Sequence, residues 1–232
     1  MRFRFPVLVS SVFIAGLLSV SQSDAGIASF SSGAGGSFNV PVVSLKEARF
    51  KTVIKQQYDF SCGSAALATL LKFHYDTDTD EQSVFKAMYD VGDQAKIKKL
   101  GFSLLDMKKF LQSIDLKADG FKLTLEKLRQ VGVPAIALVE TSGYKHFVVV
   151  KGIRGNEVVL GDPAMGVRVL GIPDFEKIWN GIAFLIRNKA SVGKESFNQE
   201  EDWSVRIKAP FGTSLSRQSL ASFTVHLPLN PF

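Results

Sequence analysis

The sequence predicts an α+β fold in which helices come first and antiparallel strands follow. Residues 64–75 are dense in Ala and Leu and contain no Gly or Pro, which indicates a buried helix. Residues 134–140, 145–153 and 157–160 are short apolar runs bounded by Gly, Pro or charged residues, which indicates buried strands. Because the helical patterns precede the strand patterns and do not alternate with them, we expect one α+β domain.

Residues 1–25 have the composition of a secretory signal peptide. Two arginines precede an apolar run over residues 5–20, and Ser23 with Ala25 approximates the small-residue pattern before a cleavage site. The run is shorter than the roughly 20 residues that span a bilayer, and later apolar runs are shorter still. We expect export to the periplasm, a mature chain that starts near Gly26 and no transmembrane domain after signal removal. The alternative is a retained N-terminal anchor.

Three regions follow the predicted signal peptide. Residues 26–40 are rich in Gly and Ser, which predicts a linker. The folded domain is expected over residues 41–190, beginning with a strand that leads toward residue 54. Residues 191–232 are expected to form a polar C-terminal tail.

Charge and composition exclude some classes of function. The 28 basic and 22 acidic residues give a formal charge of +6, but the basic residues are spread singly and in pairs. The run at residues 96–99 indicates a solvated face, so nucleic-acid binding is not expected. Asp76, Asp78 and Asp80 alternate as in a calcium loop, but no Gly follows at the sharp turn, so we expect no metal.

Capping residues mark the other helices. Thr79 or Asp80 would cap one helix, and Ser103 with Asp106 forms a capping pair for the next. Gly132 closes a third helix. The helices are expected at residues 82–89, 104–111 and 124–130, with a later helical turn at 175–179 and a last strand at 182–186.

Cys62 is the single cysteine of the sequence and lies where a loop gives way to the first predicted helix. Backbone N–H groups and the positive end of the helix dipole at such a position favour thiolate over thiol. One cysteine excludes an internal disulfide and is unusual in an exported chain. Cys62 is therefore a candidate nucleophile, and the alternatives are a buried inert cysteine or an intermolecular bridge.

A cysteine nucleophile needs a base, and the sequence offers three histidines. His74 lies twelve residues after Cys62 on the same predicted helix, which places it about 18 Å away, too far to reach the thiol. His226 lies in the predicted tail. His146 opens the strand over residues 145–153 and is the candidate base.

Asp162 is the candidate that orients His146. A three-residue turn at residues 154–156 would pair Val148 with Asp162 and leave His146 and Asp162 diagonal on one face, roughly 7–8 Å apart between backbone positions. A two-residue turn would place them on opposite faces. Pro163 ends the ladder, so the carboxylate can turn toward the imidazole and hold its useful tautomer.

The oxyanion of an acyl-transfer reaction needs hydrogen-bond donors. The backbone N–H of Cys62 is one candidate, and an amide side chain from Gln56 or Gln57 is the other. Consecutive side chains of an extended segment point to opposite faces, so one of the two glutamines is expected to face the site. The residue pattern leaves the choice open.

Three separated motifs resemble the papain-like double-glycine leader peptidases, the bacteriocin-processing family 39 of the cysteine peptidases. They are Gln56 with Cys62-Gly63 six residues on, His146 before four apolar strand residues, and Gly161-Asp162-Pro163. The resemblance covers residues 41–190 and implies a papain-like fold. It also implies Cys62 as nucleophile, His146 as base and later acid, Asp162 as the orienting group and Gln56, chosen over Gln57, as the oxyanion donor. No metal or cofactor is implied.

Members of that family often form the N-terminal domain of ABC exporters and remove leaders after a Gly-Gly pair. This sequence carries a predicted signal peptide and no transporter segment, so it is most similar to the peptidase component of bacterial functional-amyloid export operons. The resemblance implies a peptide or protein substrate, such as an exported amyloid or leader-bearing protein, and an outer-membrane secretion partner, and leaves Gly-Gly specificity open. The alternatives are a non-catalytic module that presents an exported substrate to a secretion pore, and acyl transfer to an amine.

Overall fold

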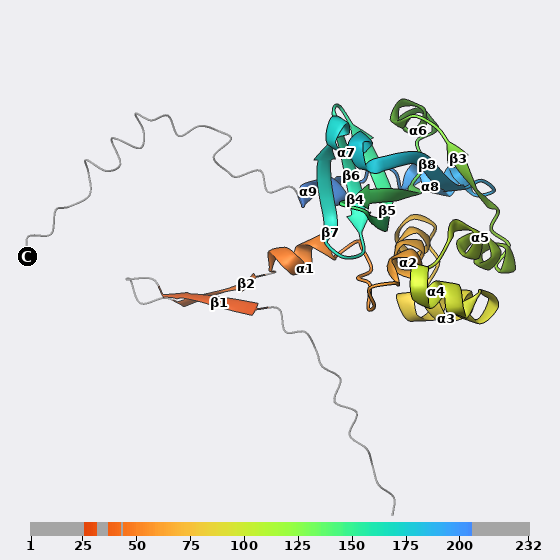
Figure 1. The fold of residues 1–232 in the computed structure, drawn as a ribbon. Coiled ribbons are helices and arrows are strands. Elements are labelled where there is room, and N and C mark those ends of the chain that lie inside the picture. The colour runs from red at the N-terminus through yellow and green to blue at the C-terminus, as the bar shows by residue number, and fades with distance from the viewer. Residues whose placement is uncertain (1–25, 32–36, 43, 206–232) are drawn as a thin grey trace, which may run out of the picture. The chain divides into compact units, whose positions relative to one another are not determined.

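Figure 1 presents the structure, a computed structural model that describes residues 26–31, 37–42 and 44–205. The predicted signal peptide, the Gly-Gly pair of the predicted linker and His226 lie outside the described residues. The chain divides into two units, Met1–Ser44 and Leu45–Phe232. Within the described ranges, no helix is both long and apolar enough to cross a membrane.

The first unit contains one pair of antiparallel strands among its described residues, β1 (Gly26–Ser31) and β2 (Ser37–Val42). Their register places Phe30 opposite Phe38. The sequence predicted a linker over residues 26–40 from its Gly and Ser content, but the structure has two paired strands in this range. The aromatic and β-branched residues of these strands favour an extended, paired backbone.

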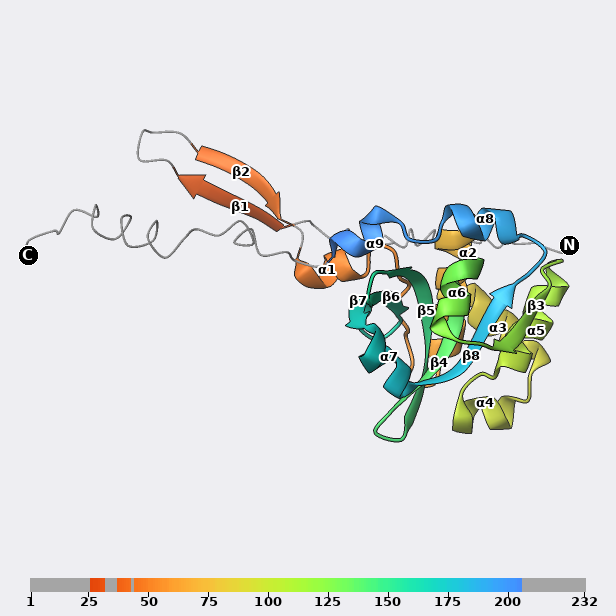
Figure 2. The ribbon, with the colours of Figure 1, turned by 90° about the horizontal axis from the view of Figure 1, so that it is seen from above.

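The second unit is built on a six-stranded antiparallel sheet with the order β3-β8-β4-β5-β6-β7, which Figure 2 shows from one edge to the other. Strands β4, β5 and β6, at the centre, are buried along most of their length, as their near-continuous apolar runs predicted. The strands are β3 (Ala118–Lys122), β4 (Ala135–Thr141), β5 (Tyr144–Arg154), β6 (Glu157–Asp162), β7 (Gly166–Gly171) and β8 (Trp179–Ile186).

Helices cover both faces of this sheet (Figure 1). One apolar core joins α2, α3 and α5 to the sheet through Leu67, Met88 and Met107, and a second joins α6 and α7 through Leu128 and Phe175. The helices are α1 (Leu45–Arg49), α2 (Cys62–His74), α3 (Glu81–Val91), α4 (Gln94–Leu100), α5 (Leu104–Ser113), α6 (Leu125–Val131), α7 (Ile172–Ile178), α8 (Ala190–Glu195) and α9 (Glu200–Ser204). The predicted α+β class is confirmed.

The capping predictions are confirmed in detail. Asp80, one of the two residues that the sequence allowed, caps α3 by accepting from the N–H of Ser83 at 2.7 Å. Ser103 and Asp106 form the capping box of α5. Gly132 ends α6 in the left-handed conformation, as expected, while Thr124, expected as the first residue of this helix, is its cap.

Two boundaries of the second unit differ from the sequence prediction. Residues 45–49 were expected in a strand but form α1, because Leu, Lys, Glu, Ala and Arg are all strong helix formers. The domain was expected to end at residue 190, but α8 and α9 continue it. Asp202 of α9 is 2% exposed and is paired with a buried lysine of β5, an interaction that local sequence patterns do not reveal.

Candidate active site

Cys62 is the first residue of α2, as the sequence predicted, and is 8% exposed. Ser61 does not cap the helix with its side chain, because its hydroxyl instead donates to the carbonyl of Tyr58 at 3.0 Å. The N–H groups of the first turn are therefore not neutralised by that side chain. The positive end of the helix dipole also lies at this end of α2.

Gly63 allows the start of α2 to pack closely against α5. A Cβ at this position would lie 2.9 Å from Cβ of Phe102 and 3.0 Å from Cε of Met107, closer than side-chain atoms pack. A side chain at residue 63, next to Cys62, would therefore require Phe102 and Met107 or the start of α2 to shift.

His146 and Asp162 are brought together across β5 and β6. His146 Nε2 lies 2.8 Å from Asp162 Oδ1, and both side chains are buried. The same oxygen accepts the backbone N–H groups of Ala164 at 2.9 Å and Met165 at 3.2 Å, while Oδ2 accepts from Arg168 Nη1 at 3.2 Å. Burial would raise the pKa of Asp162, but the bond with His146 and these further donors lower it. The carboxylate is held ionised and oriented.

The register that allows this contact arises differently from the prediction. The turn between β5 and β6 has two residues, since Arg154 lies opposite Glu157, and such a turn alone would place His146 and Asp162 on opposite faces. A β-bulge between Val150 and Gly152 shifts the register by one residue, so that Val149 lies opposite Gly161. The predicted three-residue turn is wrong, and the bulge produces the same pairing.

His146 carries a proton at neutral pH. Burial would lower the pKa of His146, but interactions with Asp162 and Cys62 outweigh this and raise the pKa to about 9. Its second ring nitrogen, Nδ1, is buried and has no hydrogen-bond partner among the described residues. Since Nε2 is bound to Asp162, Nδ1 is the nitrogen that can exchange a proton with Cys62 or a substrate.

Gln56 lies beside the loop that follows Asp162. Its backbone N–H donates to the carbonyl of Pro163 at 3.0 Å, and its side-chain Nε2 donates to the carbonyl of Tyr58 at 3.1 Å. Nε2 has a second N–H for another acceptor. Gln57 is exposed, and its backbone N–H bonds to Glu81 of α3 at 3.3 Å. Of the two glutamines, Gln56 is the one that is bonded to the loop after Asp162.

Residues 50–191 match the model of the Peptidase C39 family. The chain belongs to this family of cysteine-type peptidases. It is 42% identical over 152 residues to the probable functional amyloid protease FapD of Pseudomonas aeruginosa, covering 66% of this chain and 67% of that protein. It is 45% identical over 145 residues to FapD of Pseudomonas fluorescens, covering 62% and 64%. The chain thus spans about two thirds of the length of these relatives.

The fold of this C39 peptidase also matches a solved structure, the peptidase domain of Streptococcus ComA, a bi-functional ABC transporter in a quorum-sensing pathway. The TM-score is 0.50 at 21% identity, over 58% of this chain and 96% of that one. The papain-like fold and the family resemblance predicted from the three motifs are confirmed.

A cavity of about 880 Å³ opens beside Cys62 in this C39 peptidase. Tyr144 stands at its edge, where its hydroxyl donates to the carbonyl of Asp59 at 3.1 Å and its ring stacks on that of His146 with 6.1 Å between centroids. The other lining residues are mainly apolar with three lysines, and include Phe60, Lys98, Lys99, Leu100, Phe102, Leu104, Leu105, Leu138, Lys145 and Phe147.

His74 lies far from this cavity, as predicted. It is buried at the C-terminal end of α2, where Nδ1 contacts the carbonyl of Ser196 at 3.2 Å. Burial, and next the charge of Lys151, lower the pKa of His74 to about 3. Among the described residues, no three His, Cys, Asp or Glu side chains are grouped so as to hold a metal ion.

Arg168 and Tyr144 belong to the site geometry and were missed from the sequence. Arg168 lies in β7, where it is the one polar residue among two valines and a leucine in a short strand that begins and ends with glycine. Tyr144 lies two residues before His146, so the period of a strand places both on one face. That spacing is a signal from which Tyr144 could have been found.

Proposed function

We propose that this chain is an exported cysteine endopeptidase that cleaves a peptide bond in a secreted protein of a functional-amyloid or related secretion system. The observation that carries the proposal is the 2.8 Å bond between His146 and Asp162, next to Cys62 at the start of α2. The names of the two Pseudomonas relatives support the substrate class. The signal-peptide pattern of residues 1–25 supports action in the periplasm.

The first step is attack by the Cys62 thiolate on a substrate carbonyl carbon. A C–S bond forms, and the electron pair of the carbonyl π bond moves to oxygen. The backbone N–H of Cys62 and the second N–H of Gln56 Nε2 donate to this oxyanion. Donors fixed in advance at a partly buried site are worth about 10²–10³-fold in kcat.

The second step expels the leaving amine. His146, protonated at neutral pH, gives its Nδ1 proton to the amine as the C–N bond breaks, which leaves an acyl-enzyme on Cys62. Asp162 keeps its negative charge throughout and stabilises the imidazolium form.

Water completes the cycle. Neutral His146 accepts a proton from water at Nδ1, the water oxygen attacks the acyl carbon, and the C–S bond breaks. The product leaves as a carboxylic acid, which releases its remaining proton to solvent, and Cys62 thiolate and protonated His146 are regenerated. The same residues would serve acyl transfer if a substrate amine replaced water at this step.

The cavity beside Cys62 is the substrate cleft of this proposal. Its apolar lining suits large apolar side chains, and Lys98, Lys99 and Lys145 suit acidic ones. For the scissile bond itself we propose a Gly-Gly pair, which would bring no side chains against the aromatic rings of Tyr144 and Phe147 in the lining.

The test is incubation of the mature chain and of Cys62→Ala with exported proteins encoded beside its gene, read by mass spectrometry. We expect cleavage by the wild type alone, with one water added across the cut bond. A substrate in which Gly-Gly is replaced by Leu-Leu tests the specificity in the same assay.

Equal processing by the wild type and Cys62→Ala would refute the peptidase proposal. Binding of the substrate by both proteins without cleavage would instead indicate a presenting module. Products joined to an amine, with no water added, would indicate acyl transfer.

A further inference from the structure

Lys151 is a charged residue buried in the middle of β5, between the positions of His146 and Asp162 in the chain. Its side chain is 1% exposed, and it lies at the β-bulge that sets the register of β5 against β6. A lysine in such a place needs partners, because an unpaired buried charge is strongly unfavourable.

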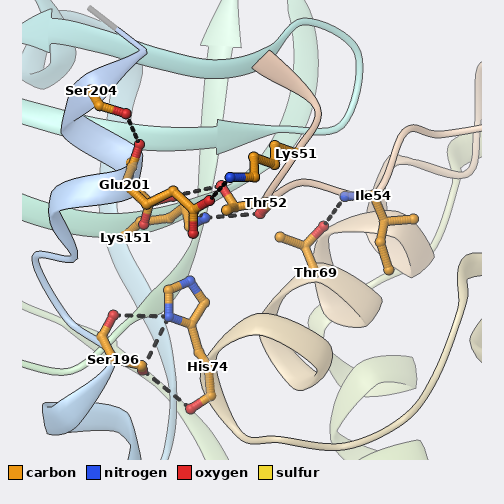
Figure 3. Close-up of polar contacts among 10 residues, drawn as sticks. Lys51, Thr52, Ile54, Thr69, His74, Lys151, Ser196, Glu201 and Ser204 are labelled. Atoms are coloured by element: carbon orange, nitrogen blue, oxygen red, sulfur yellow. Dashed lines mark hydrogen bonds and ion pairs between the residues drawn. The ribbon is translucent and has the colours of Figure 1, made fainter. Parts of the chain in front are cut away.

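The partners of Lys151 come from both ends of the domain (Figure 3). Its Nζ donates to Asp202 Oδ1 of α9 at 2.5 Å and to the carbonyl of Thr52 at 2.8 Å. The Thr52 hydroxyl donates to the same oxygen of Asp202 at 2.6 Å. Nζ also lies 5.6 Å from the ring centroid of Phe73 in α2. One buried ion pair thus joins four segments.

The C-terminal strap, residues 189–205, also contacts the backbone of the bulge. The N–H of Asn198 donates to the carbonyl of Lys151 at 3.0 Å. A Cβ on the neighbouring Gly152 would lie 2.3 Å from Asn198 Oδ1, so the strap and the bulge approach as closely as a glycine permits. At the C-terminal end of α2, Ser196 of the strap contacts His74 (Figure 3).

These contacts connect the Gln56–Cys62 segment of the candidate site with its His146–Asp162 pair. Thr52 lies four residues before Gln56, whose backbone N–H is bonded to Pro163. The bulge at Lys151 places His146 on the same face as Asp162. The matched family model ends at residue 191, so most of the strap lies beyond it.

We propose that Lys151 and Asp202 are positioning residues of the peptidase, through which the C-terminal strap holds the Gln56–Cys62 segment in register with the His146–Asp162 pair. This inference rests on the proposed function. Buried ion pairs are weak sources of net stability and in some proteins specify one arrangement, which is the role assigned to this pair.

The experiment compares Asp202→Asn with Glu201→Gln in the otherwise unchanged chain. Glu201 is the neighbouring residue of α9, and its ion pair with Lys51 is exposed. Thermal unfolding followed by circular dichroism identifies a temperature at which every variant is folded. At that temperature kcat and KM are measured on the substrate that the wild type cleaves. We expect Asp202→Asn to lower kcat about 10- to 100-fold with KM little changed, as for a small misplacement of catalytic groups, and Glu201→Gln to match the wild type.

A second variant, Lys151→Met with Asp202→Leu, replaces the pair by apolar side chains of similar size. It keeps the strap packed and removes the bonds to Thr52, so the same loss of kcat is expected. Wild-type kcat in either variant, when folded, overturns the proposal. Failure of both to fold also overturns it, since the pair would then be structural.

Failure of the proposed function is separable from failure of this inference. If the wild type cleaves nothing, the proposed function fails, and the positioning role is read from the rate at which iodoacetamide alkylates Cys62. A slower rate in Asp202→Asn than in Glu201→Gln supports positioning, and equal rates contradict it.

Discussion

His146 shows how a single residue can be set for chemistry by two opposing effects. Burial disfavours its charged form, yet the contacts with Asp162 and Cys62 raise its pKa from 6.5 to about 9. Because the pKa is higher in the folded chain than in the unfolded one, protonation of His146 stabilises the fold fully below about pH 6.5. This contribution is lost as the pH rises through about 9.

The same shift predicts the alkaline limit of activity. The leaving amine needs the proton of His146, so kcat/KM is expected to fall as the pH rises through about 9. In Asp162→Asn the alkaline fall of kcat/KM should move to lower pH, because burial lowers the pKa of His146 and the charge of Asp162 no longer raises it. The kcat of this variant should also drop about a hundredfold or more. The pH dependence of kcat/KM for the two proteins on one substrate checks this. A fall at the same pH in both would show that Asp162 does not control the protonation of His146.

At the scale of elements, helix α2 places the candidate nucleophile, Cys62, and the bulge in β5 sets the position of the candidate base, His146, against Asp162. The start of α2 depends on Gly63, where a side chain would meet Phe102 and Met107. An added methyl group at such a site costs about 1–3 kcal/mol through overpacking.

We therefore expect Gly63→Ala to destabilise the fold by about 1–3 kcal/mol and to lower activity further than stability alone explains, because Cys62 is the adjacent residue. Urea unfolding and kcat measurements check the two effects. Gly120→Ala in β3 is the matched control, since its Cβ would make ordinary contacts at 3.6 Å and beyond. Equal effects of the two substitutions would refute the role given to Gly63.

Local signals predicted the elements whose ends carry caps. Ser103 and Asp106 predicted the start of α5, and Gly132 predicted the end of α6. Helix α4 was missed because its lysines leave Ile97 as its one buried residue, which gives no apolar period. The bulge was missed because the residue within it, Lys151, is a lysine in an apolar strand and finds its partner Asp202 only 51 residues along the chain. Cys62, His146 and Asp162 could be chosen from residue type and position, but the register that pairs His146 with Asp162 depends on the bulge.

At the scale of the whole molecule, the C-terminal strap closes the domain through a buried charge pair. Replacing one partner of such a pair leaves the other charge buried and alone, which costs about 3–5 kcal/mol. Lys151→Ala should therefore lower the free energy of unfolding by about this amount. Lys51→Ala, which removes an exposed pair with Glu201, should change it by less than about 1 kcal/mol. Similar urea midpoints for the two variants would contradict the role given to the buried Lys151–Asp202 pair in closing the domain.

Export is the other prediction at this scale. Expression of the full sequence in a bacterium with an intact secretion pathway should yield a periplasmic chain that begins near Gly26, since residues 1–25 carry the signal-peptide pattern. N-terminal sequencing of the periplasmic fraction measures this. Recovery of the uncleaved chain in the membrane fraction would favour the retained anchor.

The rate at which iodoacetamide alkylates Cys62 at mildly acidic pH decides most directly whether this cysteine is an activated nucleophile. An ordinary thiol is almost wholly protonated there and reacts slowly. We expect the wild type to react far faster than free cysteine, and His146→Ala to lose most of that advantage because the imidazolium no longer accompanies the thiolate. A wild-type rate equal to that of free cysteine would contradict the assignment of Cys62 and His146 as a catalytic pair.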